Sequence, residues 1–150
     1  MTDHSASFRR TALILTATGA LPFLAFAVAT SILEPPTNAT AGLWLQTYSA
    51  VILSFLGGIR WGMALKDTGA DAGTLGLSVL PALAAWVILP FSIILMPNPA
   101  WYLALAGVFV VLLIWDWSAA SVPAWFKPMR MGASVAAIGS LVFAWAVQVV

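Results

Sequence analysis

The sequence predicts an all-α protein, a polytopic membrane bundle of five transmembrane helices. Hydrophobic residues make up 62% of the 150 residues and charged residues 7%, whereas a soluble domain carries about 25% charged residues. Five apolar segments reach the length of about 20 residues that a membrane-spanning helix needs. A β-barrel would instead show short segments of alternating polarity. We therefore expect residues 1–150 to form a single transmembrane domain.

The spans are predicted near residues 11–33, 43–65, 75–96, 101–121 and 129–148. The short connections between them are rich in Pro, Gly, Asn, Asp and Thr, which break or start helices. Ala27-Val28-Ala29 offers the alternative that the first segment is a cleaved signal peptide. Its apolar region is longer than the 7–15 residues usual for such peptides, which favours an uncleaved span.

The basic residues predict the orientation of the bundle. All six fall on one side of the predicted membrane: Arg9, Arg10, Arg60, Lys66, Lys127 and Arg130. The positive-inside bias places this side in the cytoplasm, so we expect a cytoplasmic amino terminus and an outside carboxyl terminus. The first residues do not resemble an Arg- and Ser-rich organellar presequence, which favours a bacterial inner membrane.

Arg60 lies inside the apolar run FLGGIRWG, residues 55–62. It precedes Leu65 by a helical distance of about 7–8 Å, inside the hydrocarbon edge but short of its centre. One interpretation is snorkelling, in which the long side chain reaches the cytoplasmic headgroups. The other is an ion pair with Asp116, the only other charge within an apolar span.

Asp116 is too short to snorkel and needs a donor inside the bundle. Its predicted depth matches that of Arg60, so bidentate hydrogen bonds between the two would offset both burial costs. Such a pair has a structural interpretation, the specification of packing, and a functional one, ligand binding or proton transfer.

The second span is predicted to have two different faces. Four small residues recur at every fourth position and predict a tight helix-packing face: Ala50, Ser54, Gly58 and Gly62. The roughly opposite side carries Gln46, Ser49 and Arg60. This polar side predicts either hydrogen bonds between helices or the lining of a cavity.

Trp61, Trp115 and Trp117 lie beside the two buried charges in the sequence. They are typical of the aromatic belt at a membrane interface. The alternative is that they line a pocket for a flat ligand or stack on the Arg60 guanidinium.

The segment YSAVILSFLGGIRWGMAL, residues 48–65, followed by a proline-bearing span and the later WDW, resembles a family of small bacterial and mitochondrial membrane proteins. That family is known as a domain of unknown function. The resemblance implies a five-helix inner-membrane protein without an assigned reaction, and it implies no catalytic residue.

Motifs of catalysis are missing from the sequence. It has no cysteine and one histidine, His4, and it lacks the motifs of zinc proteases, nucleotide binding and nucleophilic catalysis. The net charge of +1 gives no reason to expect nucleic acid. We expect a non-enzyme without a metal or cofactor.

Two functions remain open from the sequence. The first is a scaffold or accessory subunit of an inner-membrane complex, with the lipid bilayer and other subunits as partners. The alternative is a binding protein or transporter for a small anionic or flat amphipathic ligand, quinone- or porphyrin-like, near Arg60 and Asp116.

Overall fold

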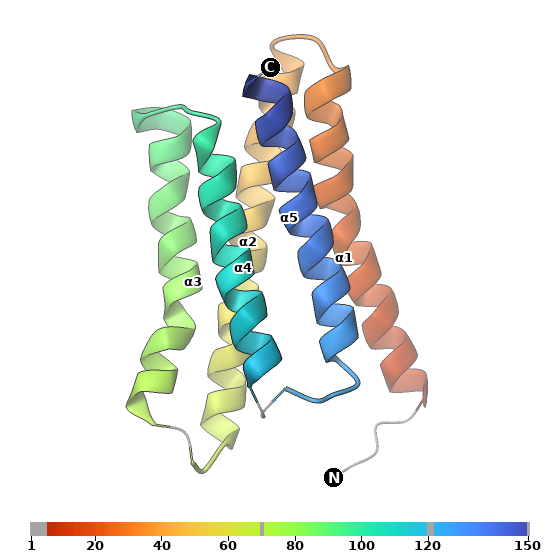
Figure 1. Ribbon diagram of the computed structural model, residues 1–150, viewed down its shortest axis with the longest axis vertical. Coiled ribbons are helices and arrows are strands. Elements are labelled where there is room, and N and C mark those ends of the chain that lie inside the picture. Colours follow the sequence, from red (N-terminus) through yellow and green to blue (C-terminus); the bar gives the residue numbers. More distant parts are fainter. Residues whose placement is uncertain (1–5, 70, 120–121, 150) are drawn as a thin grey trace.

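Five long helices run alternately up and down in the computed structural model, which describes residues 6–69, 71–119 and 122–149 (Figure 1). The elements are α1 (Ala6–Ile32), α2 (Thr37–Lys66), α3 (Ala72–Pro90) continued by η1 (Phe91–Leu95), α4 (Ala100–Ser118) and α5 (Lys127–Val149). Counting α3 and η1 as one span, five helices are long and apolar enough to cross a membrane. This confirms the predicted all-α fold class with five membrane-length helices.

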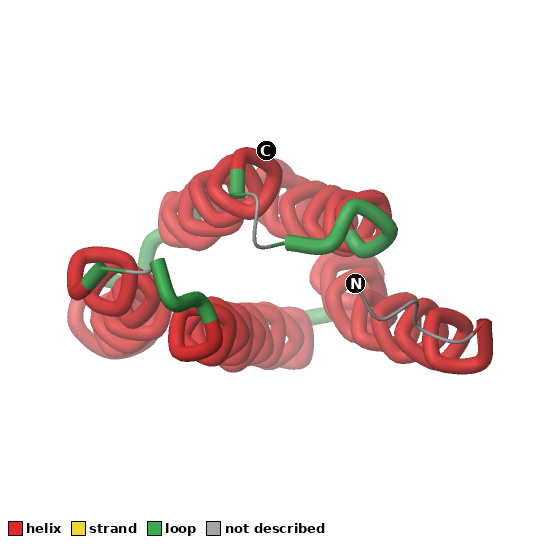
Figure 2. Tube along the Cα trace, turned by 90° about the horizontal axis from the view of Figure 1, so that it is seen from below, coloured by secondary structure: helices red, strands yellow, loops and turns green. Residues whose placement is uncertain are grey.

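The helices form a ring in chain order. Figure 2 looks along the bundle, and each helix packs beside its sequence neighbour while α5 closes on α1. The α3–α4 contact is the sparsest around the ring. The start of α1 and all six lysine and arginine residues lie toward one end of the bundle, which we call the basic end.

The helix boundaries differ from the predicted spans at several places. α1 begins at Ala6 and α2 at Thr37, earlier than the predicted starts at residues 11 and 43. The first turns of both helices contain polar residues. A prediction based on runs of apolar residues therefore starts these helices too late. α4 ends at Ser118, and residues 120–121 of the predicted fourth span lie outside the described residues.

The prolines have different effects on the helices. Pro22 and Pro81 remain inside α1 and α3. After Pro90 the backbone widens into the π-helical turn Phe91–Leu95, and the Met96 N–H donates to the Phe91 carbonyl at 2.8 Å. A proline supplies no N–H, and a local π turn is one way in which a membrane helix satisfies its backbone again.

Asp71 starts α3 in the loop outside the spanning segment. Its Oδ1 accepts hydrogen bonds from the Thr74 backbone N–H and from the Thr74 hydroxyl, each at 2.8 Å. The backbone hydrogen bond, followed by the one from the hydroxyl, lowers the pKa of the Asp71 carboxyl. This capping fixes where the chain re-enters the bundle.

Each helix buries one face in the interior of the ring. On α4 the buried face is the series Tyr102, Leu105, Phe109, Leu112 and Asp116. The steps of three and four residues keep this series on one side of the helix. Phe109 crosses the interior and packs edge-to-face on Phe23 of α1, with ring centroids 5.7 Å apart. The outward faces carry large apolar side chains, such as Val111 and Ile94, that suit contact with lipid.

Three of the four residues of the predicted packing face of α2 are not buried against other helices of this chain. Ser54 and Gly58 are exposed and Gly62 is half-buried. A Cβ atom built on either glycine would meet nothing within 4 Å. Only Ala50 is buried. The large apolar side chains of α2 set its orientation, so the small residues turn away from the neighbouring helices of this chain.

The close contact between α2 and its neighbour is made instead by Gly57, the residue directly before Gly58. A Cβ atom at Gly57 would lie 2.6 Å from the Ser78 carbonyl oxygen of α3. Real Cβ atoms do not approach an oxygen so closely, so α2 and α3 can pack in this position only with glycine there. Gly57 thus holds α2 against α3 one turn from Arg60.

We predict that Gly57→Ala destabilises the bundle and that Gly58→Ala does not. The added methyl at residue 57 must displace α3 backbone, and such overpacking costs about 1–3 kcal/mol, whereas the methyl at residue 58 meets open space. Thermal unfolding of both variants in the same detergent compares adjacent glycines of one helix. Equal losses, or a larger loss at Gly58, would contradict the assigned packing.

Candidate functional site

Three charged side chains meet inside the bundle at its basic end. Asp116 lies in the last turn of α4, Arg130 in the first turn of α5, and Arg60 in α2. Their relative exposures are 7%, 5% and 6%, respectively. We call these residues the charged triad. Asp116 is buried because it continues the inward-facing series of α4.

Arg130 is the hydrogen-bonded partner of Asp116. Its Nε donates to Asp116 Oδ2 at 2.7 Å. Its Nη1 donates to the hydroxyl of Ser134, one turn along α5, at 2.8 Å. Charge-assisted hydrogen bonds of this length are the strong ones in proteins. This contact fixes the end of α4 against the start of α5.

Arg60 approaches the other carboxylate oxygen. Its Nε lies 3.7 Å from Asp116 Oδ1, an ion pair without a hydrogen bond. The Arg60 guanidinium carbon lies 4.0 Å from the ring centroid of Trp115, within the range of a cation–π contact. The Arg60 side chain is therefore directed into the bundle, between α2 and α4.

Three polar atoms of the triad lack a hydrogen-bond partner among the described residues. They are Arg60 Nη1, Asp116 Oδ1 and Arg130 Nη2. The pocket that all three residues line together has about 10 Å³ of open space. That volume holds one water molecule at most. The three side chains pack closely around that pocket, and their unmet donors and acceptor carry a cost in free energy.

The structure does not bring Gln46 and Ser49 to Arg60. Gln46 precedes Arg60 by fourteen residues in one helix, an axial distance of about 21 Å. The Ser49 hydroxyl donates to the Leu45 carbonyl of its own helix at 2.7 Å. Both side chains are buried, but they lie in the half of α2 that is away from the basic end and not at the triad.

The three tryptophans that neighbour the charges in the sequence also differ in their positions relative to the triad. Trp115 is half-buried and contacts Arg60. Trp61 and Trp117 are exposed on the outer surface. The Trp117 carbonyl accepts a hydrogen bond from Lys127 Nζ at 2.7 Å. Of the three, Trp115 is the one whose ring lies against the Arg60 guanidinium.

Sequence reasoning missed the role of Arg130. It treated Arg130 as one of the basic residues at the membrane edge, because the fifth span was predicted to start at residue 129. A signal was present in the spacing of Arg130, Ser134, Ala137, Leu141 and Ala144, all buried on α5. Steps of four and three residues place Arg130 on the inward face of that helix.

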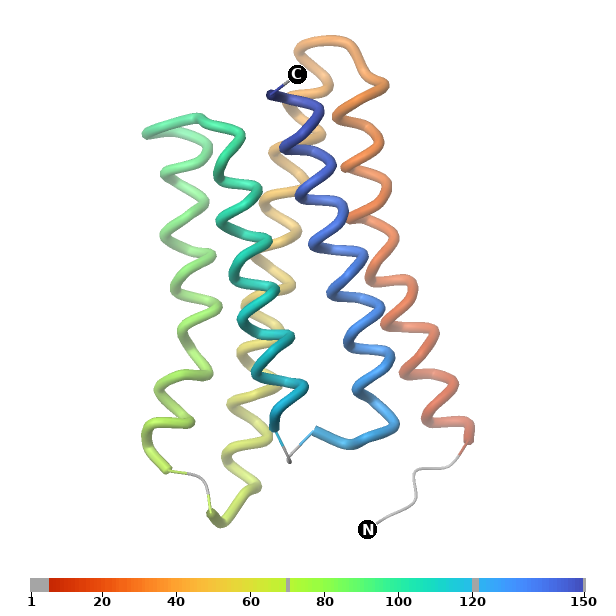
Figure 3. Tube along the Cα trace, viewed as in Figure 1, coloured from red at the N-terminus to blue at the C-terminus, as the bar shows by residue number. Residues whose placement is uncertain are grey.

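A cavity of about 330 Å³ adjoins the triad, between α1, α2, α4 and α5. The ends of α1 and α2 diverge toward the basic end (Figure 3). Small side chains on α1 and α5 leave the space open: Ala12, Thr16, Gly19, Ala20, Ala133 and Ala137. The volume falls within the range of about 300–1,000 Å³ typical of ligand pockets.

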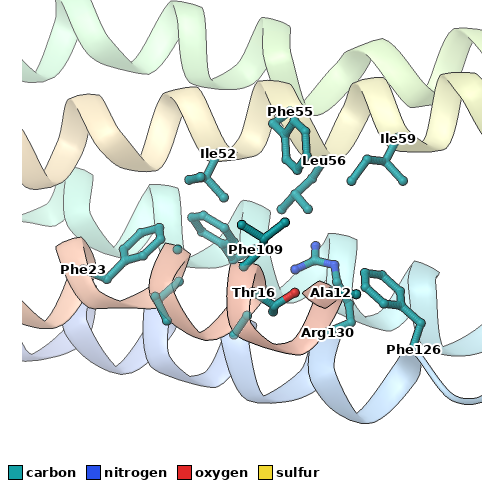
Figure 4. A pocket seen from close by; sticks show the side chains of 15 residues that line it. Ala12, Thr16, Phe23, Ile52, Phe55, Leu56, Ile59, Phe109, Phe126 and Arg130 are labelled. Atoms are coloured by element: carbon teal, nitrogen blue, oxygen red, sulfur yellow. The ribbon is translucent and has the colours of Figure 1, made fainter. Parts of the chain in front are cut away.

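The cavity is apolar along its length and ends at a charge. Figure 4 shows Phe23 toward one end, with Arg130 and Phe126 at the other. Thr16 is the second polar side chain in the lining. Leu15 and Phe55, on α1 and α2, line the cavity and are also exposed on the outer surface. The opening therefore lies between α1 and α2.

A second polar contact joins α4 and α5 far from the basic end, where α2 also packs closely. Gln148 Nε2 of α5 donates to the Tyr102 hydroxyl of α4 at 2.9 Å. The Tyr102 hydroxyl also lies closer to the Cβ position of Gly42 on α2 than a real Cβ atom allows, so a larger residue there would displace this hydroxyl. Polar side chains thus join α4 and α5 at both ends of the bundle, with the apolar core between, and α2 packs closely on the Tyr102 hydroxyl at the far end.

The fold and the buried charges define a multi-pass α-helical membrane protein. The chain belongs to the family described as Protein of unknown function (DUF3429), which matches residues 8–146. This confirms the family resemblance inferred from the sequence.

Two curated relatives carry the name Transmembrane protein 69. The protein of Xenopus tropicalis is 38% identical over 98 residues, covering 63% of this chain and 38% of the relative. The protein of Mus musculus is 32% identical over 137 residues, covering 87% of this chain and 54% of the relative. The chain thus spans about half or less of the length of these relatives. No solved structure matches the chain.

We predict that Asp116 couples more strongly to Arg130 than to Arg60. Asp116→Asn preserves side-chain size, Arg130→Gln and Arg60→Gln replace the charge by a shorter polar amide, and the two double variants close the thermodynamic cycles. Breaking a buried pair costs about 3–5 kcal/mol, and coupling energies of contacting residues are about 0.5–3 kcal/mol. The hydrogen-bonded pair at 2.7 Å should lie at the upper end and the pair at 3.7 Å below it.

Equilibrium unfolding in mixed detergent micelles measures both cycles. Additive losses for Asp116 and Arg130, or a stronger coupling to Arg60, would contradict this division of the triad.

Proposed function

We propose that this protein binds a membrane-soluble amphipathic molecule inside its helical bundle. The observation that carries the proposal is the cavity of about 330 Å³ that is apolar for most of its length and ends at Arg130. Pockets for small ligands have this composition, a largely hydrophobic lining with few polar groups that fix orientation. The binding alternative from the sequence is therefore preferred, with its site moved from Arg60 to the neighbouring cavity.

The opening between α1 and α2 supports entry from the bilayer. Leu15 and Phe55 at the opening are apolar and exposed, on helices that suit contact with lipid chains. A molecule dissolved in the membrane would reach the cavity laterally without crossing a polar surface.

The proposal also covers the membrane in which the protein lies and its orientation there. The gathering of lysine and arginine at the basic end favours a cytoplasmic position for that end. We assign the protein to a bacterial inner membrane, with the amino terminus inside and the carboxyl terminus outside. The bound molecule would then have its polar end toward the cytoplasmic leaflet.

A second candidate function is the scaffold or accessory subunit of a membrane complex. Its support is the close packing of the three charged side chains around a shared pocket of about 10 Å³. Charges packed in this way often specify one arrangement of helices. Under this alternative the protein would act through a partner subunit and carry no small molecule.

Native mass spectrometry after gentle extraction separates the two functions. Binding predicts this chain with a co-purified small molecule, and the scaffold predicts a heteromeric partner.

We predict that Gly19→Leu removes the co-purified molecule and that Gly139→Leu does not. Gly19 lines the cavity, and a Cβ atom there would meet only the Tyr48 hydroxyl, at 3.9 Å, so a leucine would occupy the open space. Gly139 lies on the exposed face of α5, and a Cβ atom there meets nothing within 4 Å. Mass spectra of the wild type and both variants measure the bound fraction.

Equal thermal midpoints of the two variants would serve as the control for folding. Retention of the molecule in Gly19→Leu, or its absence from the wild type, would contradict binding in this cavity.

A further inference from the structure

We infer that the polar end of the bound molecule is an oxyanion, a carboxylate or phosphate on a single apolar chain, and that Arg130 holds it. This inference rests on the proposed function and names the ligand class for the same cavity. Its basis is the net charge of the triad, the contact of Arg130 with both Asp116 and the cavity, and the composition of the cavity lining.

The charged triad is not neutral. Arg60 and Arg130 contribute two positive charges and Asp116 one negative charge, which leaves a net charge of +1 among buried groups. The other acidic residues of the described chain are Glu34, Asp67 and Asp71, and all three are exposed. A buried charge without a counter-ion is costly, so an anion in the cavity would lower the free energy of the bundle.

Arg130 contacts both the triad and the cavity. Its Nε and Nη1 are used by Asp116 and Ser134. Its Nη2 is buried and has no hydrogen-bond partner among the described residues. Arg130 and Phe126 line the 330 Å³ cavity and also the small space beside Asp116. A donor is therefore left unused in the side chain that closes the end of the cavity (Figure 4).

The lining limits the rest of the molecule to an apolar chain. Apart from Arg130 and Thr16, the residues around the cavity have apolar side chains or are glycine. The volume is near the lower end of the ligand-pocket range, which suits one chain and not a two-chain phospholipid. A long-chain carboxylate and a single-chain phosphate monoester share the required chemistry.

Photolabelling of the whole protein in nanodiscs of phosphatidylcholine tests this assignment. The probes are a diazirine analogue of palmitic acid, its methyl ester and the corresponding alcohol, which share one chain. We expect the acid to label peptides of α1 and α5 about tenfold more than the ester or the alcohol, because only the acid offers an anion to Arg130. Unlabelled oleate and lysophosphatidate as competitors distinguish a carboxylate from a phosphate source.

The key variant is Arg130→Gln combined with Asp116→Asn, which removes both partners of the hydrogen-bonded pair and leaves no lone buried carboxylate. We expect the preference for the acid to disappear in this variant. Lys127→Gln is the control, since it removes a basic residue at the same end that does not line the cavity. It should keep the preference.

The outcomes separate the two proposals. Equal labelling by acid, ester and alcohol would overturn the oxyanion assignment and leave binding of an apolar chain intact. An acid preference that survives in the double variant, or is lost with Lys127→Gln, would overturn the role of Arg130. Absence of saturable labelling by every probe would overturn the proposed function as well.

Discussion

The carboxylate of Asp116 is the group on which the arrangement of this bundle depends. An aspartate buried in the last turn of a membrane helix requires donors from its neighbours, because lipid offers none. Arg130 supplies a hydrogen bond from α5 and Arg60 an ion pair from α2. Three helices that are separate in sequence are thereby held at one depth. The guanidinium groups are buried because of the same carboxylate, so none of the three residues is stable there alone.

Polar contacts at the two ends of the bundle restrict how the helices of the ring can pack. At the far end Tyr102 contacts Gln148 and approaches Gly42, on the same three helices as the triad. Between the two ends, α4 and α5 meet along continuous buried faces. Helix α1 joins by its own contacts, including a hydrogen bond from the Tyr48 hydroxyl to the Gly19 carbonyl at 2.7 Å. Toward the basic end its small side chains do not fill the interior, and the cavity beside Arg130 remains.

Composition and the length of the apolar segments were enough to predict the architecture of the protein. Five helices of membrane-spanning length, the all-α class and the family follow from apolar segments and one motif, and each is confirmed. The failures concern the direction in which a residue faces. In the pair Gly57-Gly58, spacing alone could not tell which glycine meets α3, because that depends on the neighbouring backbone at Ser78. Arg130 was placed at the membrane edge because the positive-inside bias already explains a basic residue near the predicted start of a span.

The protonation state of Asp116 tests the central claim most directly. Isotope-edited infrared spectroscopy, with labelled aspartate and Asp116→Asn as the difference reference, reports on this one side chain in the intact protein at neutral pH. Two arginines within 4 Å of its oxygens predict the paired stretching bands of an ionised carboxylate, shifted when Arg130→Gln removes its hydrogen bond. The carbonyl band of a protonated acid, or a carboxylate band unchanged by Arg130→Gln, would contradict a bundle organised around this shared charge.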